Sequence, residues 1–122
     1  MKNDESRPDL GPRTKVFARR IIRLYAALPK TDVVAQVLGK QVLRSGTSVG
    51  ANYREAHRAR SKAEFIAKIG DCLKEADETL YWLELLLDES FLRATRLQPL
   101  VNEANELVAI FTTISKHARG II

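Results

Sequence analysis

The 122-residue sequence has little of the chemistry that builds metal and redox sites. It contains one cysteine, Cys72, and two histidines, His57 and His117. A single cysteine excludes an intrachain disulfide and a cysteine-cluster metal site. The histidines lie far apart and would need carboxylates to complete a metal site, so we interpret both as surface residues. Cys72 falls among apolar residues at helical spacing, which indicates a small core residue and not a nucleophile.

Long apolar runs are also missing. No segment approaches the roughly 20 apolar residues of a membrane-spanning helix, and residues 1–13 lack the apolar region of a signal peptide. We therefore expect a cytoplasmic protein with no membrane partner.

Catalytic motifs are absent as well. The serine-rich segment around Ser45 and Ser48 has no nucleophile-elbow pattern, and Gly46 and Gly50 are not followed by the Lys-Ser/Thr of a phosphate-binding loop. No pair of acids with a nucleophile stands out. The sequence therefore predicts a protein that is not an enzyme and that holds no cofactor or metal.

What the sequence does contain is helical periodicity. Apolar residues recur every three or four positions in four segments, which predicts helices at about 15–28, 32–60, 62–88 and 96–117. No alternating strand pattern is present, and the connections are short. These features predict an all-α protein, an antiparallel up-down-up-down four-helix bundle over residues 14–119. Residues 1–13, which contain Pro8, Gly11 and Pro12, are expected to form a flexible arm.

The ends of these helices carry sequence signals. Thr14 is the expected N-cap of the first helix, and Pro29 ends it after Leu28. Thr31 or Asp32 is expected to cap the second helix. Capping boxes are predicted to begin the third helix at Ser61 to Glu64 and the fourth at Thr95 to Gln98, with Pro99 in the first turn.

The second helix has an unusual inward stripe, because polar residues occupy positions where leucine is common. The predicted stripe consists of Val34, Leu38, Gln41, Ser45, Ser48, Val49, Asn52 and Ala56. Burying an amide or hydroxyl without a partner costs about 1–3 kcal/mol. We therefore predict a polar network, together with Arg44 or a third-helix group, that fixes helix register or a subunit contact. Its proposed members are Gln41, Ser48, Asn52, Glu55 and Glu75. The alternative is that Glu55 is a solvated helix residue.

Two further features suggest contact with other molecules. Tyr81, Trp82 and Leu85 lie away from the core stripe of the third helix, and the fourth helix adds Ile110. Large apolar side chains outside a core typically mark association surfaces, so these four residues are the predicted oligomer interface.

The second feature is a basic surface. Residues 1–60 carry a net charge of +8 and residues 61–88 a net charge of −4. The cations predicted to share one surface are Lys15, Arg19, Arg23, Lys40, Arg44, Arg54 and Arg58. Such a surface binds RNA or DNA through phosphates, without sequence specificity, since no aromatic stacking platform is evident beside the arginines. The alternative is that these residues form ordinary solubilising helix faces.

The segment Ser48 to Glu55, SVGANYRE, together with Gln41, Arg44, Phe65, Glu75 and Leu80, resembles a bacterial family. This is the family of four-helix-bundle proteins first met as products of intervening sequences in 23S ribosomal RNA genes. The resemblance covers roughly residues 14–117 and departs after Glu55, where Ala56-His57 replaces a usual glycine. It implies an up-and-down bundle, a homopentamer and no enzymatic activity. A related group of basic bundles implies a further partner, the reverse transcriptase of a retroelement.

The predicted function is therefore a non-catalytic homo-oligomeric scaffold or accessory protein whose basic surface binds nucleic acid. Two alternatives remain open: an accessory subunit of a reverse transcriptase or another nucleic-acid enzyme, and an adaptor that binds only proteins.

Overall fold

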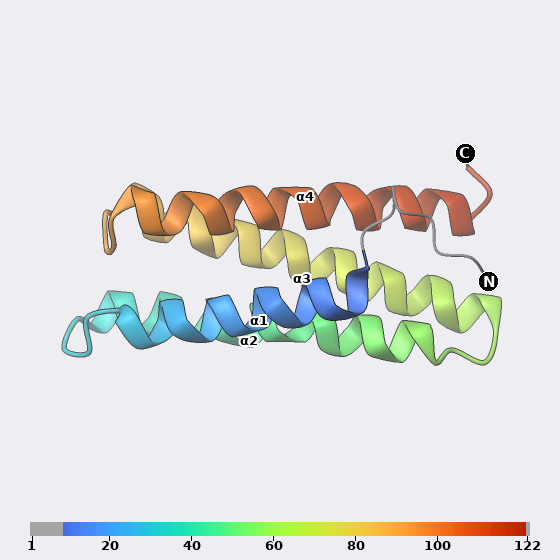
Figure 1. Cartoon of the computed structure of the whole chain (residues 1–122), viewed down its shortest axis with the longest axis horizontal. Coiled ribbons are helices and arrows are strands. Elements are labelled where there is room, and N and C mark those ends of the chain that lie inside the picture. The colour runs from blue at the N-terminus through green and yellow to red at the C-terminus, as the bar shows by residue number, and fades with distance from the viewer. Residues whose placement is uncertain (1–8, 122) are drawn as a thin grey trace.

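The computed structural model describes residues 9–121, which form four helices. They are α1 (Leu10–Ala27), α2 (Val33–His57), α3 (Lys62–Asp88) and α4 (Ala94–Ala118). Consecutive helices run in opposite directions and are joined by short connections (Figure 1). The predicted all-α, up-down-up-down bundle is confirmed. Within the described residues, no helix combines the length and apolarity that crossing a bilayer requires.

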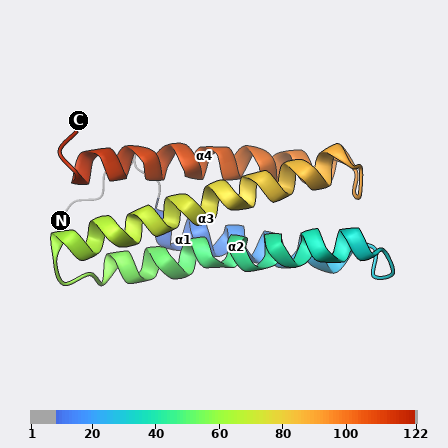
Figure 2. The same cartoon turned by 180° about the vertical axis from the view of Figure 1, so that it is seen from behind.

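The helices are arranged as two adjacent hairpins. α1 lies beside α2, α4 lies beside α3, and α3 runs obliquely across the molecule in contact with α2 (Figures 1 and 2). The edge between α1 and α4 has far fewer close contacts than the other three edges. Side chains from all four helices fill the core, and its largest fully buried members include Phe17, Ile21, Ile69, Leu83 and Phe111.

An ion pair joins α1 to α4 at the sparse edge. The Arg13 guanidinium donates to both carboxylate oxygens of Glu103, at 2.7 and 2.8 Å, and to Glu106 at 2.9 Å. These hydrogen bonds raise the pKa of Arg13 further above its usual value, with Glu103 the main cause. Bidentate geometry makes this a better defined contact than an ordinary surface ion pair.

α1 begins earlier than the sequence predicted. Residues 1–8 of the expected arm lie outside the described residues, but helix starts at Leu10 and includes Gly11 and Pro12. Pro12 is tolerated because a first-turn residue has no intrahelical acceptor for its N–H. Thr14 is consequently not the N-cap; it is buried within the helix, and its hydroxyl donates to the Leu10 carbonyl at 2.6 Å.

The other boundaries show which cap signals were reliable. Asp32 caps α2 by accepting from the Ala35 N–H, and Ser61 caps α3 by accepting from Glu64. α2 ends at His57, three residues before the predicted end, and α4 begins at Ala94 without a side-chain cap. The Thr95 capping box was therefore wrong.

α2 is rotated relative to the predicted stripe. Its buried positions are Ala35, Gly39, Val42, Ser45, Gly46, Val49 and Ala56, whereas Val34 is 54% exposed. The reason is close packing against α1. A Cβ atom built on Gly46 would lie 2.8 Å from the Ile21 side chain, and one on Gly50 would lie 3.1 Å from Thr14. The smallest residues of α2 therefore face inward, and the larger Val34 is left outside.

We expect Gly46→Ala to lower the free energy of unfolding by about 1 kcal/mol. Alanine is favoured over glycine in a helix by about 1 kcal/mol, but overpacking against the branched, fully buried Ile21 costs about 1–3 kcal/mol. The control is Gly70→Ala in α3, where a Cβ would meet no atom within 4 Å. This variant should gain up to about 1 kcal/mol. Urea denaturation measures both, and a stabilised Gly46→Ala variant would show that α1 and α2 pack less closely.

Candidate nucleic-acid interface

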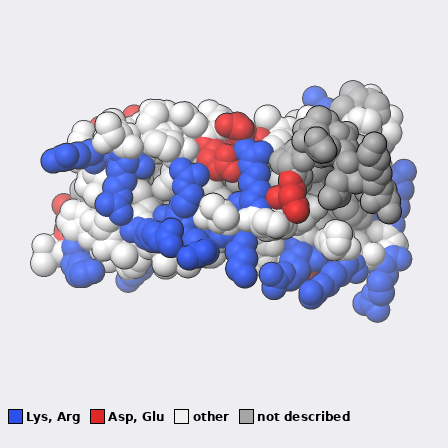
Figure 3. Space-filling view, viewed as in Figure 1, with Lys and Arg blue, Asp and Glu red and all other residues white. Residues whose placement is uncertain are grey.

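Six of the seven predicted cations are exposed on the adjacent helices α1 and α2, and we call these six residues the basic face. Its members are Lys15, Arg19, Arg23, Lys40, Arg54 and Arg58. Figure 3 shows lysine and arginine side chains gathered over these two helices. The ion pairs formed between residues 9 and 121 involve Arg13, Arg44 and Lys68, and none of these six. The basic face therefore keeps its positive charge with respect to the described acids.

Arg44 does not belong to this surface. It reaches across to α3, where its guanidinium donates to Glu75 at 3.3 Å and also to Glu78. Two carboxylates offset its single charge, so Arg44 links helices and adds little to the positive potential. The sequence offered two roles for Arg44, one on this surface and one as a partner of the polar network that includes Glu75. The choice between them depends on the side of α2 on which α3 packs, which follows from the handedness of the bundle.

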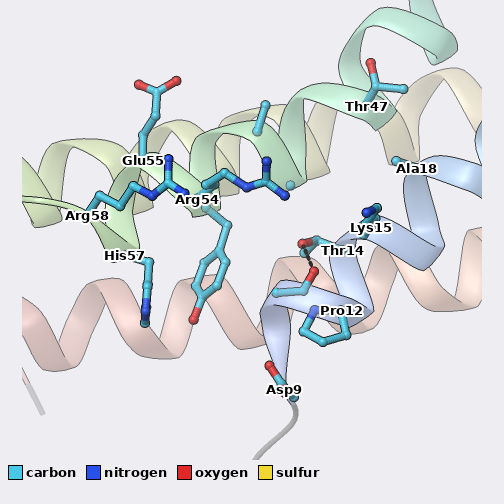
Figure 4. A pocket seen from close by; sticks show the side chains of 14 residues that line it. Asp9, Pro12, Thr14, Lys15, Ala18, Thr47, Arg54, Glu55, His57 and Arg58 are labelled. Atoms are coloured by element: carbon cyan, nitrogen blue, oxygen red, sulfur yellow. Dashed lines mark hydrogen bonds between the residues drawn. The ribbon is translucent and has the colours of Figure 1, made fainter.

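The basic face is hollowed at one end. A groove of about 830 Å³ lies between the start of α1 and the C-terminal half of α2 (Figure 4). We call it the α1–α2 groove. Its lining residues are Asp9, Gly11, Pro12, Thr14, Lys15, Ala18, Thr47, Gly50, Ala51, Tyr53, Arg54, Glu55, His57 and Arg58.

Three members of the basic face, Lys15, Arg54 and Arg58, line this groove. Two acids line it as well. The Glu55 carboxylate forms an ion pair with Lys68 of α3 at 2.7 Å and points to the opposite side of α2 from His57 (Figure 4). Asp9 lies at the start of α1. The cations therefore dominate the part of the groove along α2.

Aromatic side chains accompany these cations, although the sequence predicted no aromatic stacking platform beside the arginines. Tyr53 and His57 line the groove, with ring centroids 6.3 Å apart, and Tyr53 also packs 6.1 Å from Phe111 of α4. Burial raises the pKa of Tyr53, with a smaller contribution from Asp9, so its hydroxyl stays neutral. The sequence signal for this arrangement was the spacing. Tyr53 and His57 are four residues apart and lie on one face of α2, and Arg54 and Arg58 lie in the same way on the neighbouring face.

The five residues of the predicted polar network are not gathered into one cluster. Ser48 donates to the Arg44 carbonyl and Asn52 to the Ser48 carbonyl, both within α2. Glu55 pairs with Lys68 and Glu75 with Arg44, so these two contacts link α2 to α3 separately. Gln41 is partly buried. Hydrogen bonds to the preceding helical turn satisfy short polar side chains without a partner helix. Ser48 and Asn52 therefore do not need the network that the sequence predicted for them.

The buried polar contact between α2 and α3 is instead a hydroxyl pair. Ser45 and Thr79 are both fully buried, and their hydroxyl oxygens lie 2.8 Å apart. Each hydroxyl also lies within hydrogen-bonding distance of a carbonyl of its own helix, Gln41 for Ser45 and Glu75 for Thr79. The chain of bonds leaves neither hydroxyl without a partner. Ser45 was on the predicted stripe, whereas Thr79 was not noticed.

The predicted oligomer interface is divided between two places. Tyr81 is 56% exposed on α3 and packs edge-on against Trp82, while Leu85 is partly buried. Ile110 follows Glu106, the partner of Arg13, by one turn and so lies on the α1-facing side of α4.

Other apolar residues accompany the α3 group. The antiparallel register set by Ser45 and Thr79 places Val34 and Val37, 54% and 55% exposed, beside the last turns of α3. We call the group Val34, Val37, Tyr81, Trp82 and Leu85 the apolar patch. The Trp82 Nε1 atom is buried and has no hydrogen-bond partner among residues 9–121.

Cys72 is buried, and both histidines are exposed. Burial raises the pKa of Cys72 to about 12, so its thiol stays protonated and unreactive at neutral pH. Across residues 9–121, no three histidine, cysteine or acidic side chains are grouped so as to hold a metal ion. His57 is exposed in the groove, and His117 is exposed near the end of α4.

Comparison with known proteins gives matches to a family model and to solved structures. The model of the 23S rRNA-intervening sequence protein family matches residues 12–113. A solved structure from Bacteroides thetaiotaomicron VPI-5482, a protein of unknown function from the S23 ribosomal protein family, is 40% identical. The alignment covers 88% of this chain and 98% of that chain, with a TM-score of 0.80. No curated protein matches the sequence.

We expect a double-mutant cycle of Ser45→Ala and Thr79→Val to give a coupling energy of about 1 kcal/mol, because one hydroxyl pair is broken in either single variant. Thr112→Val is the matched control. Its hydroxyl bonds only to the Val108 carbonyl of α4 within the described residues, so its coupling to Ser45 should stay below about 0.5 kcal/mol. Denaturation midpoints measure both cycles. Equal coupling in the two cycles would contradict a direct contact.

Proposed function

We propose that this chain, which belongs to the 23S rRNA-intervening sequence protein family, is a non-catalytic homo-oligomeric scaffold or accessory protein that binds RNA or DNA. The family name does not itself state a ligand. The observation that carries the proposal is the basic face: six exposed cations on two adjacent helices, outside the ion pairs formed among residues 9–121.

The spacing of these cations suits a phosphate backbone. Lys15, Arg19 and Arg23 follow one another at intervals of four residues, which is roughly 6 Å along a helix. Arg54 and Arg58 repeat the interval on α2. Such a row contacts successive phosphates through charge, and it releases bound counterions as it does so. Binding of this kind does not depend on base sequence.

The apolar patch supports the oligomeric part of the proposal. Tyr81, Val34 and Val37 are each more than half exposed, and Trp82 and Leu85 are partly exposed on α3. Aromatic residues surrounded by aliphatic ones are typical of interface centres. Copies joined through this patch would present several basic faces, and affinity would rise by avidity. Five copies is the number that the family resemblance implies.

We expect reversal of four cations, Arg19→Glu, Arg23→Glu, Arg54→Glu and Arg58→Glu together, to abolish binding to a 30-nucleotide RNA in a gel-shift titration. Wild-type affinity should fall steeply with salt, with a log–log slope of up to about −4 if all six cations contact phosphates of a single strand. Loss of four of the six contacts removes most of this interaction.

The control carries the same change in net charge elsewhere. Lys74, Arg93, Lys116 and Arg119 are exposed on α3, at the start of α4 and at its end, and reversing them should leave most of the affinity. Equal losses in both variants would mean that only net charge matters. If the wild type binds neither RNA nor DNA at low salt, the proposal fails, and the protein-binding adaptor becomes the better reading.

We expect light scattering at micromolar concentration to show an oligomer, and the Val37→Glu, Tyr81→Glu double variant to have the mass of a single subunit. Charges placed in the apolar patch would have to be buried without partners. Val16→Glu with Ile22→Glu is the matched control, since these residues are 52% and 51% exposed on α1. A monomeric wild type would contradict self-association. Dissociation of only the control would place the contact on α1.

A further inference from the structure

The α1–α2 groove differs from the rest of the basic face because helix α2 extends beyond the start of α1. Thr14 packs against Gly50, so Leu10, the first residue of α1, lies near the level of Arg54. His57 therefore lies beyond the N-terminal end of α1. α2 continues as helix through Ala56 and His57, and this last turn is left uncovered by α1.

Small residues line the α1–α2 groove where the two helices lie side by side. Gly11 and Ala18 line it from α1, and Gly50 and Ala51 line it from α2. The resulting volume of about 830 Å³ is in the range of small-molecule sites, about 300–1,000 Å³.

The lining offers two kinds of contact at once. Lys15, Arg54 and Arg58 provide cationic donors for a phosphate, and Tyr53 and His57 provide aromatic surface for a base. Aromatic rings beside arginines are the arrangement by which proteins hold single-stranded nucleic acid. In a duplex the bases are paired and stacked inside the helix, and extruding one costs free energy. Such a site therefore takes its base more readily from a single strand.

We propose that the α1–α2 groove binds one nucleotide of a single-stranded RNA or DNA, with its base against Tyr53 and His57 and its phosphate beside Lys15, Arg54 and Arg58. The inference rests on the proposed function and adds a preference for single strands. A polymer is favoured over a free nucleotide because Arg19 and Arg23 continue the row of cations from Lys15 along α1, outside the groove.

Asp9 limits where the phosphate lies. Its carboxylate repels phosphate at the α1 end of the groove, whereas Glu55 is engaged with Lys68 and turned away. The phosphate is therefore placed away from Asp9, beside Arg54 and Arg58 of α2 and Lys15 of α1. The base occupies the deeper part, where Tyr53 packs against Phe111.

Fluorescence anisotropy with three labelled 12-mers tests this inference on the full chain: a single strand, a duplex of the same sequence, and an abasic single strand that has the same phosphates without bases. The wild type should prefer the single strand to the other two. Tyr53→Leu and His57→Ala should each weaken single-strand binding by about tenfold, within the range for loss of one stacked base. Neither should change binding of the abasic strand.

One further variant separates the ring of Tyr53 from its hydroxyl. Tyr53→Phe keeps the ring and should retain wild-type affinity, whereas a role for the hydroxyl alone would make it as weak as Tyr53→Leu and would overturn the stacking role. His57 is exposed, so His57→Ala tests the groove even if replacing Tyr53 disturbs packing against Phe111.

The outcomes distinguish the two proposals. If Tyr53→Leu and His57→Ala bind the single strand like the wild type while the four-arginine reversal still abolishes binding, the groove inference is overturned and the basic face stands. Equal wild-type affinity for duplex and single strand also overturns it. If adenosine monophosphate saturates the protein at concentrations similar to those of the single strand, the preference for a polymer is overturned and the groove binds a free nucleotide. If no nucleic acid binds at all, the proposed function itself has failed.

Discussion

Close packing between α1 and α2 is the constraint on which the rest of the structure depends. Gly46 meets the branched side chain of Ile21 at a distance that leaves no room for a Cβ atom, and a Cβ atom on Gly50 would crowd Thr14. This contact fixes the rotation of α2 about its axis. It turns Ser45 toward Thr79 of α3 and leaves Lys40, Arg54 and Arg58 on the outside beside the cations of α1. It also sets the stagger of the two helices, from which the α1–α2 groove results.

The polar residues of α2 serve different purposes on its different sides. Toward α3, the buried hydroxyl pair and the Arg44 contacts with Glu75 and Glu78 specify register, since a shift by one residue would bury polar groups without partners. Toward solvent, Arg54 and Arg58 are left available for anions. Ser48 and Asn52 are satisfied within the helix and contribute to neither.

The sequence predicted the helices and the stripes of α1, α3 and α4 well, because their large apolar residues have a strong helical period. It predicted α2 less well. A buried stripe of glycine, alanine and serine differs little in hydrophobicity from the exposed face of the helix. The sequence therefore predicted Val34 as an inward residue, whereas the structure buries Gly39 and Gly46 and exposes Val34. The groove was missed for a different reason. Tyr53 and Arg54 are adjacent in the chain, and both line the groove because α2 extends beyond the start of α1. The relative position of two helices cannot be read from a single residue of either helix.

The weak edge between α1 and α4 has a consequence for folding. Nearly all close contacts between helices join helices that are neighbours in sequence. The hydrogen bonds of Arg13 with Glu103 and Glu106 link the first helix to the last. The relative contact order is therefore low, and little loop-closure entropy opposes the formation of each hairpin. The α1–α4 edge joins the segments most distant in the sequence, so its closure carries the largest cost in loop entropy.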